Sequence, residues 1–255
     1  MSKLFQSIGK TELLSHTVEQ AIEAAIREGH LNVGDRLPSE FELCNQFGVS
    51  RTVIREALRM LSARGLVRIE KGRGVFVCAP SIESVSNPMA LYLHMNVGPD
   101  HALEVVRARQ LIEPVIAAEA ARRHTAKDVR RIQENLEALK ACSGSFEQLT
   151  QVDMEFHVLI AKATHNPVIP LIIHPIQQLM PRIKLNVYLS VEDAHASAVE
   201  WHTAIAEAIF ARDAERAQAC MAQHLRIAEE HVRKMLATLE EKTRPLGNGE
   251  SPNVS

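Results

Sequence analysis

The sequence predicts a mainly α-helical chain in two parts, three helices with a β-hairpin followed by an all-α helical bundle. Three observations support this fold class. Ala, Leu, Ile, Glu and Arg dominate the 255 residues, and these residues favour helices over a β-sandwich. Apolar residues recur at helical spacing along most of the chain. Hydrophobic residues make up 46 % of the chain, which supplies a packed core and excludes wholesale disorder.

The first two helices are predicted from periodicity and capping. Apolar residues recur every three or four positions over about 11–28, which predicts a first helix. A second helix is expected over about 39–47. Ser39 can cap its third amide while Glu42 reaches back to the start, the pattern of a capping box.

A third helix and a hairpin complete residues 1–79. Ser50 can cap a helix over about 51–64, which a glycine then ends. Short apolar segments at 66–69 and 75–77 predict two strands, and the glycines between them permit the positive φ of a tight turn. This order of elements is a winged helix-turn-helix.

The charge of the chain is unevenly distributed. The formal net charge is −2, from 29 basic and 31 acidic residues. Residues 1–79 hold 11 basic and 9 acidic residues, whereas residues 80–255 hold 18 basic and 22 acidic residues. Residues 51–73 alone carry seven basic residues and two acidic ones. A near-neutral total therefore does not exclude a nucleic-acid partner, and the basic stretch predicts a face for a polyanion.

The third helix separates into an apolar face and an arginine face. Arg51 and Arg55 lie four residues apart near its N-terminus, with Thr52 beside them. Arginine at this position of a helix can bond guanine in the major groove or bind phosphate. The hairpin tip adds Lys71 and Arg73. A solvated, arginine-rich surface helix is the alternative, but the order of capped helices and basic wing favours double-stranded DNA.

This part of the chain resembles a known family. The segments 34–40, 47–58, 65–67 and 72–77 are similar to the winged-helix domain of GntR-family bacterial transcription regulators, over about residues 11–78. The chain departs from some members at Phe41, where they carry an arginine. The DNA-contacting positions that the resemblance implies are Arg36, Ser50, Arg51, Thr52, Arg55, Lys71 and Gly72, and we add the wing residue Arg73.

The remainder of the chain is predicted to be helical. Residues 80–100 contain three prolines and are expected to form a linker with a short helix near 84–95. A helical domain is expected over 101–242 and a disordered tail over 243–255, which is rich in Pro, Gly, Asn and Ser. The helices of this domain are expected at about 101–123, 126–141, 146–164, 168–190, 195–211 and 213–241.

Polar residues interrupt the apolar stripes of the helical domain. Asp153 and His157 are spaced i, i+4 on one helix face, and His202 and His224 lie on two other apolar stripes. An unpaired carboxylate inside a bundle is costly, and a divalent cation would satisfy it. Carboxylate and imidazole suit Zn²⁺, Ni²⁺ or Mn²⁺, and spacing does not choose among them. The alternative is that each histidine is an ordinary core residue.

The resemblance continues into this domain. The stretch 107–114 and the Asp153, His157, His202 and His224 positions are similar to FCD, the all-helical ligand-binding domain of the FadR subfamily. The resemblance implies that these four residues bind a divalent metal, for which we favour Zn²⁺. It also implies a small carboxylate effector. The stretch 107–113 resembles regulators of the hexuronate type, which favours a sugar acid, with lactate-like and dicarboxylic acids as the alternatives.

Arg109 is the candidate effector-binding residue. It lies on an apolar stripe, and its two possible roles are a buried ion pair with Glu113 and a clamp for the effector's carboxylate. The corresponding arginine of the family is often placed in the pocket, so the resemblance favours the clamp.

The function expected from these features is that of a homodimeric, ligand-responsive transcription regulator, usually a repressor in this family, that binds a palindromic operator. A metal-dependent enzyme acting on a small carboxylate is the first alternative. The chain lacks H-E-x-x-H and a glycine-rich phosphate loop, so we expect no enzyme. A regulator with a purely structural metal is the second alternative.

The expected location is the cytoplasm. No apolar run approaches the roughly 20 residues of a membrane span, and no signal peptide is evident at the N-terminus. The four cysteines are scattered without a C-x-x-C pair, which fits a reducing compartment and excludes a cysteine-type zinc site.

Overall fold

The fold is taken from a computed structural model, which describes residues 11–96 and 101–243. The chain divides into two compact units, Met1–Val85 and Ser86–Ser255. Helix α4 (Ile82–Asn96) begins in the first unit and ends in the second. The tail expected to be disordered lies outside the described residues, apart from Thr243 at the end of the last helix.

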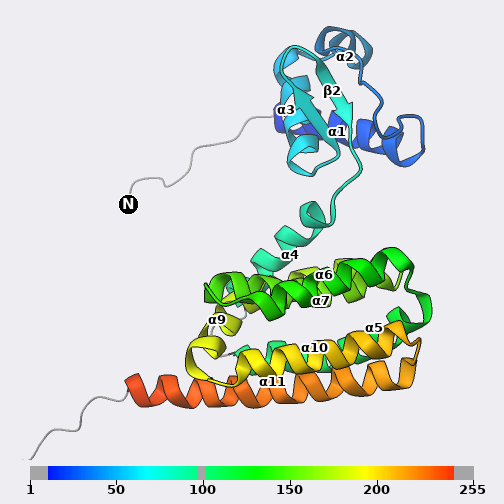
Figure 1. The fold of residues 1–255 in the computed structure, drawn as a ribbon. Coiled ribbons are helices and arrows are strands. Elements are labelled where there is room, and N and C mark those ends of the chain that lie inside the picture. Colours follow the sequence, from blue (N-terminus) through cyan, green and yellow to red (C-terminus); the bar gives the residue numbers. More distant parts are fainter. Residues whose placement is uncertain (1–10, 97–100, 244–255) are drawn as a thin grey trace, which may run out of the picture. The chain divides into compact units, whose positions relative to one another are not determined.

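The first unit has three helices and a two-stranded antiparallel sheet, as expected (Figure 1). Val67 pairs with Val77 at the base of the hairpin, and an isolated bridge joins Arg36 to Phe76. The elements are α1 (Thr11–Arg27), α2 (Glu40–Phe47), α3 (Arg51–Ala63), β1 (Val67–Glu70) and β2 (Gly74–Val77).

The core of this unit forms where the apolar faces of its helices and strands meet. Helix α3 buries one complete face in it, and α1 contributes Val18 and Ile22. Arg64, just after α3, binds Glu19 and Glu23 of α1 at 2.9 and 2.6 Å. Burial alone would raise the pKa of Glu19, but its hydrogen bond with Arg64 lowers it below the usual value. These contacts fix α3 against α1.

Helix α2 begins with the capping box that the sequence predicts. The Ser39 hydroxyl accepts from the backbone N–H of Glu42, and the Glu42 carboxylate accepts from the backbone N–H of Ser39 at 2.7 Å. Gly48 then ends α2 in the left-handed conformation, with φ 65°, where a residue with a Cβ would be strained.

Removing the cap should loosen α2 without unfolding the unit. The substitution Ser39→Ala leaves one helix-end N–H without its partner, which costs about 1 kcal/mol. Amide hydrogen exchange of α2 should therefore become roughly fivefold faster. Ser62→Ala, inside α3, is the matched control and should leave α2 exchange unchanged. Equal exchange of α2 amides in wild type and Ser39→Ala would contradict the assigned cap.

The described part of the second unit is all-helical, as predicted (Figure 1). Helix α11 packs along α5 and α10, while α7 packs on α5, α6, α8 and α9. None of the described helices is long and apolar enough to cross a membrane. The helices after α4 are α5 (Ala102–Arg123), α6 (Ala126–Ala141), α7 (Phe146–Ala163), α8 (Val168–Gln177), α9 (Met180–Ser190), α10 (Ala194–Phe210) and α11 (Ala214–Thr243).

One predicted helix was wrong. The apolar pattern over 168–190 predicted one continuous helix, whereas the structure has two, α8 and α9, separated by Gln178 and Leu179. Pro181 in the first turn of α9 explains the break. Proline donates no backbone hydrogen bond, and its ring clashes with the carbonyl four residues earlier, which lies at the end of α8.

The core of the second unit falls into two apolar clusters. One joins α5, α6, α7, α8, α10 and α11, and the other includes residues of α5, α7, α9, α10 and α11. Several charged and polar side chains are nevertheless fully buried on α5, α7, α10 and α11. These buried polar groups form the candidate site of this unit.

Candidate nucleic-acid interface and metal centre

Helix α3 presents its arginines to solvent. Its buried residues are Val53, Ile54, Ala57, Leu58 and Leu61, whereas Arg51, Thr52 and Arg55 are exposed. Ser50 caps the helix by accepting from the Val53 N–H at 3.4 Å. The N-terminal turn thus combines the positive end of the helix dipole with exposed cationic side chains, which favours phosphate and the edges of bases.

The ion pairs of this unit divide its cations into two groups. Arg55 binds Glu40 of α2 at 2.9 Å, and Glu70 of β1 pairs with both Arg68 and Arg73 at the wing. Among the cations predicted to contact DNA, Arg36, Arg51 and Lys71 form no ion pair within the described ranges. These three are the predicted contacts most available to a polyanion.

The wing tip is shaped by glycines. Gly72 has a φ of 76° between Lys71 and Arg73, and all three are exposed. Gly74 has a φ of 120°, and a Cβ there would lie 2.7 Å from Nε of Arg36. The predicted contact Arg36 therefore lies against the wing.

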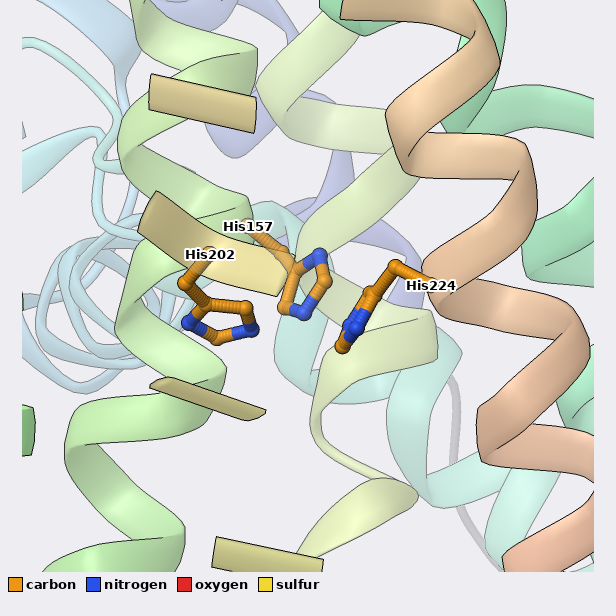
Figure 2. A group of neighbouring side chains, drawn as sticks. All are labelled: His157, His202 and His224. Atoms are coloured by element: carbon orange, nitrogen blue, oxygen red, sulfur yellow. The ribbon is translucent and has the colours of Figure 1, made fainter. Parts of the chain in front are cut away.

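Three buried histidines converge in the second unit. His157 of α7, His202 of α10 and His224 of α11 each offer a ring nitrogen, and these atoms lie within 4.8 Å of one another. Figure 2 shows the three side chains gathered around one point between their helices. Helices far apart in the sequence thus bring three of the predicted ligands together.

Asp153, the fourth predicted ligand, has no exposed surface and lies beside His202, but it is not part of the group of three converging histidines. Its Oδ1 lies 3.2 Å from Nε2 of His202 and has no hydrogen-bond partner. Its Oδ2 lies 2.5 Å from Nζ of Lys184 and accepts from the Tyr188 hydroxyl at 3.0 Å. Burial would raise the pKa of Asp153, but the Lys184 ammonium holds it well below its usual range.

The histidines have the protonation state that a metal requires. Burial lowers the pKa of His202 to about 4 and that of His224 well below its ordinary value. Burial also lowers the pKa of His157. The rings of His202 and His224 are therefore neutral at pH 7 and can ligate through a lone pair. The ring nitrogens of His157 already lie 2.9 Å from Nη2 of Arg109 and 2.6 Å from Oε2 of Glu113.

Unpartnered buried atoms test whether these residues fit a metal. Both ring nitrogens of His202, Nε2 of His224 and Oδ1 of Asp153 are buried without a hydrogen-bond partner. Leaving such groups unsatisfied is costly, and several around one point are unusual in a native core. A divalent cation would satisfy Nε2 of His224 and one ring nitrogen of His202, with Oδ1 of Asp153 next to His202, and imidazole and carboxylate donors suit Zn²⁺. The residues fit the predicted metal.

Arg109 belongs to the same buried network. Its Nε donates to Glu113 Oε1 at 2.7 Å, so the ion pair that the i, i+4 spacing allows is formed. Its Nη2 donates to Nε2 of His157 at 2.9 Å. Burial would raise the pKa of Glu113, but the charge of Arg109 lowers it to about 2. The clamp role of Arg109 stays a prediction.

A narrow pocket adjoins the histidine cluster. Apolar side chains of α5, α9, α10 and α11 line it, and its polar wall consists of Lys184, Ser197, His224 and His231. Its free volume is about 20 Å³, room for roughly one water molecule. A bound acid would therefore require some of these side chains to move. Arg109 is not part of this wall.

Sequence reasoning missed three residues of this site. Lys184 and Tyr188 were not singled out, although Met180, Lys184, Val187 and Tyr188 follow the i, i+4, i+7, i+8 spacing of a buried stripe. A lysine on such a stripe was the available signal. His231, which the sequence analysis did not single out either, is buried on α11.

Family comparisons match both units. Residues 14–77 match the model of bacterial regulatory proteins of the gntR family, and residues 104–227 match the FCD domain. Together the two matches include all the residues predicted to contact DNA, metal or effector.

Individual relatives of the chain are also bacterial regulators. The Uxu operon regulator of Haemophilus influenzae is 31 % identical over 237 residues, covering 91 % of this chain and 85 % of its own. The putative L-lactate dehydrogenase operon regulatory protein of Escherichia coli is 33 % identical over 220 residues, covering 83 % of each chain. The solved structure of Streptococcus agalactiae GntR aligns with a TM-score of 0.66 and 24 % identity, over 85 % of this chain and 99 % of that one. That likeness concerns the fold alone.

Proposed function

This chain belongs to the gntR family of bacterial regulatory proteins and is a transcription regulator rather than an enzyme, and we propose that it acts as a homodimeric repressor controlled by a small carboxylate. The observation that supports this most is the pairing of an exposed arginine helix with a buried Asp–His cluster in another unit. Its DNA partner would place it in the cytoplasm.

The DNA-binding step is assigned to α3 and the wing. Arg51 and Arg55 enter the major groove from the capped end of α3, where the helix amides also favour phosphate. Lys71, Gly72 and Arg73 approach the backbone from the wing, and Arg36 supports them. Ser50 and Thr52 complete the contact surface beside the cap.

The effector is assigned to the Asp–His cluster. Asp153, His157, His202 and His224 would hold the divalent ion, with Zn²⁺ favoured over Ni²⁺ and Mn²⁺. When bound, the ion would supply a positive centre that attracts the carboxylate of the effector. Arg109, which touches His157, is the proposed second contact for that carboxylate.

The chemical class of the effector is a small hydroxy acid. The stretch 107–113 resembles regulators of the hexuronate type, which favours a sugar acid, and the name of one relative points to lactate metabolism. Effector and operator bias one equilibrium, so an acid that weakens operator binding must bind less tightly to the operator-bound protein.

The proposed dimer is supported by exposed apolar residues on α5. Leu111 and Val115 lie one turn apart and are 81 % and 60 % exposed. Large apolar side chains at adjacent exposed positions are typical of a surface that another molecule covers, and a second copy is the partner that a palindrome requires.

Charged residues at these positions should separate the dimer. The double substitution Leu111→Glu/Val115→Glu places like charges opposite each other across a two-fold axis, so the mass by light scattering should fall from two chains to one. Val33→Glu, an exposed apolar residue of the first unit, is the control and should leave the dimer intact. A dimer that persists in the double variant would move the interface elsewhere.

Native mass spectrometry of the protein as purified tests the whole proposal. The expected mass is that of two chains with one ion per chain, together with any retained acid. An ion that stays bound while no acid binds, even in excess, would support the alternative of a purely structural metal. A protein that binds neither metal nor acid would overturn the proposed effector site.

A further inference from the structure

The two oxygens of Asp153 have different environments. Oδ2 is taken by Nζ of Lys184 at 2.5 Å and by the Tyr188 hydroxyl at 3.0 Å. Oδ1 has no hydrogen-bond partner and lies 3.2 Å from Nε2 of His202. One oxygen is thus fully satisfied, and the other is left free on the side of the histidines.

We propose that Lys184 and Tyr188 are positioning residues that hold Asp153 as a ligand through one oxygen, Oδ1. The inference rests on the metal site of the proposed function. Lys184 and Tyr188 bind Oδ2 and thereby fix the plane of the carboxylate, so Oδ1 lies 3.2 Å from Nε2 of His202. Without them the carboxylate would be free to rotate.

The local structure makes this arrangement rigid. Lys184 and Tyr188 are spaced i, i+4 on α9, so they project from one face of that helix, which packs on α7 where Asp153 lies. Both side chains are buried, and the Lys184 ammonium lies 5.6 Å from the centre of the Tyr188 ring. The two donors therefore reach the same oxygen from one face of a packed helix.

A merely structural ion pair would look different. Burying a lysine and an aspartate in a core is repaid only when their polar atoms are satisfied. Here Oδ1 of Asp153 and both nitrogens of His202 remain without hydrogen bonds. The pair satisfies one oxygen of the carboxylate and leaves the oxygen that lies 3.2 Å from Nε2 of His202, which is the arrangement expected of a carboxylate that ligates through one oxygen.

Charge points the same way. The Lys184 ammonium and the Asp153 carboxylate form a buried pair whose charges balance. Imidazole ligands add no charge of their own, so the pair leaves room for a cation beside it. The Tyr188 hydroxyl helps to orient the carboxylate and, as a neutral donor, adds no charge.

The test measures Zn²⁺ affinity of the full chain by competition with a chromophoric chelator. Lys184→Met and Tyr188→Phe should each lower the affinity roughly 10–100-fold, as the loss of a group that orients a ligand does. Lys184→Arg, which retains a cationic donor, should recover most of the loss. Lys162→Met and Tyr92→Phe change exposed residues and should leave the affinity unchanged.

Co²⁺ bound in place of Zn²⁺ gives a second readout. Its visible spectrum depends on coordination number, so the spectra of Lys184→Met and Tyr188→Phe should differ from that of the wild type at full occupancy. A substitution that only weakens packing would lower the melting temperature of the metal-free protein and leave the spectrum unchanged.

The possible outcomes separate this inference from the proposed function. If the wild type takes up no Zn²⁺, Ni²⁺ or Mn²⁺, the proposed metal site fails. If the wild type binds Zn²⁺ and both variants bind it equally well, the positioning role is overturned while the site stands. Tighter binding by Lys184→Met would also overturn it, because Lys184 would then compete with the ion.

Discussion

Replacing Arg51 and Arg55 by alanine should abolish specific operator binding and leave the first unit folded. Both side chains are exposed, and the Arg55–Glu40 ion pair lies at the surface, where such pairs contribute little to stability. Each arginine that bonds a guanine contributes about 1–3 kcal/mol of discrimination. The double variant should therefore lose specific affinity by roughly 30-fold to 10⁴-fold.

Fluorescence anisotropy at one fixed salt concentration measures this loss, with a duplex selected from a random pool by the wild-type protein. The control is Lys127→Ala/Arg130→Ala on α6, which removes the same charge from an exposed surface of the second unit. That control should bind as the wild type does. Sequence-specific binding retained by Arg51→Ala/Arg55→Ala would count decisively against the proposed docking of α3.

The double substitution His202→Ala/His224→Ala should empty the metal site. It removes two of the three imidazoles, and the remaining Asp153 and His157 supply only half of a tetrahedral set. Metal content should fall from about one ion per chain to near zero. A chelator should lower the melting temperature of the wild type, because the ion stabilises only the folded state, and should not affect the variant.

Elemental analysis after extensive dialysis measures the ion content. His195→Ala is the matched control, since His195 lies on the same helix as His202 and bonds the Leu139 carbonyl outside the cluster. It should retain a full complement of metal. One ion per chain in His202→Ala/His224→Ala would show that the ligand assignment is wrong.

The fold was largely predictable because its signals are local. The capping box at Ser39 and the cap at Ser50 start α2 and α3 where the sequence places them. The error at 168–190 has a local cause too. The prediction from the apolar pattern counted Pro181 as one more apolar residue. A proline has no backbone N–H and its ring clashes with the preceding turn, so it interrupts the hydrogen bonds of a helix.

The candidate site was predictable only in part. Asp153 and His157 share a helix face, so their i, i+4 spacing identifies them as a pair. Nothing in the order of residues shows that Lys184 and Tyr188 of α9 bind one oxygen of Asp153 and leave the other free. That contact depends on how α9 packs on α7.

By itself, the sequence determined the order of the elements, the exposed arginines of α3 and the family of the chain. Periodicity, capping and glycine turns act over a few neighbouring residues, so the residue order contains them. Only the tertiary structure decided which cations are already paired, that Arg109 touches both Glu113 and His157, and that one oxygen of Asp153 stays free. Those facts depend on side chains from distant helices meeting in a water-poor interior, where an unpartnered polar atom is costly and its partners therefore matter most.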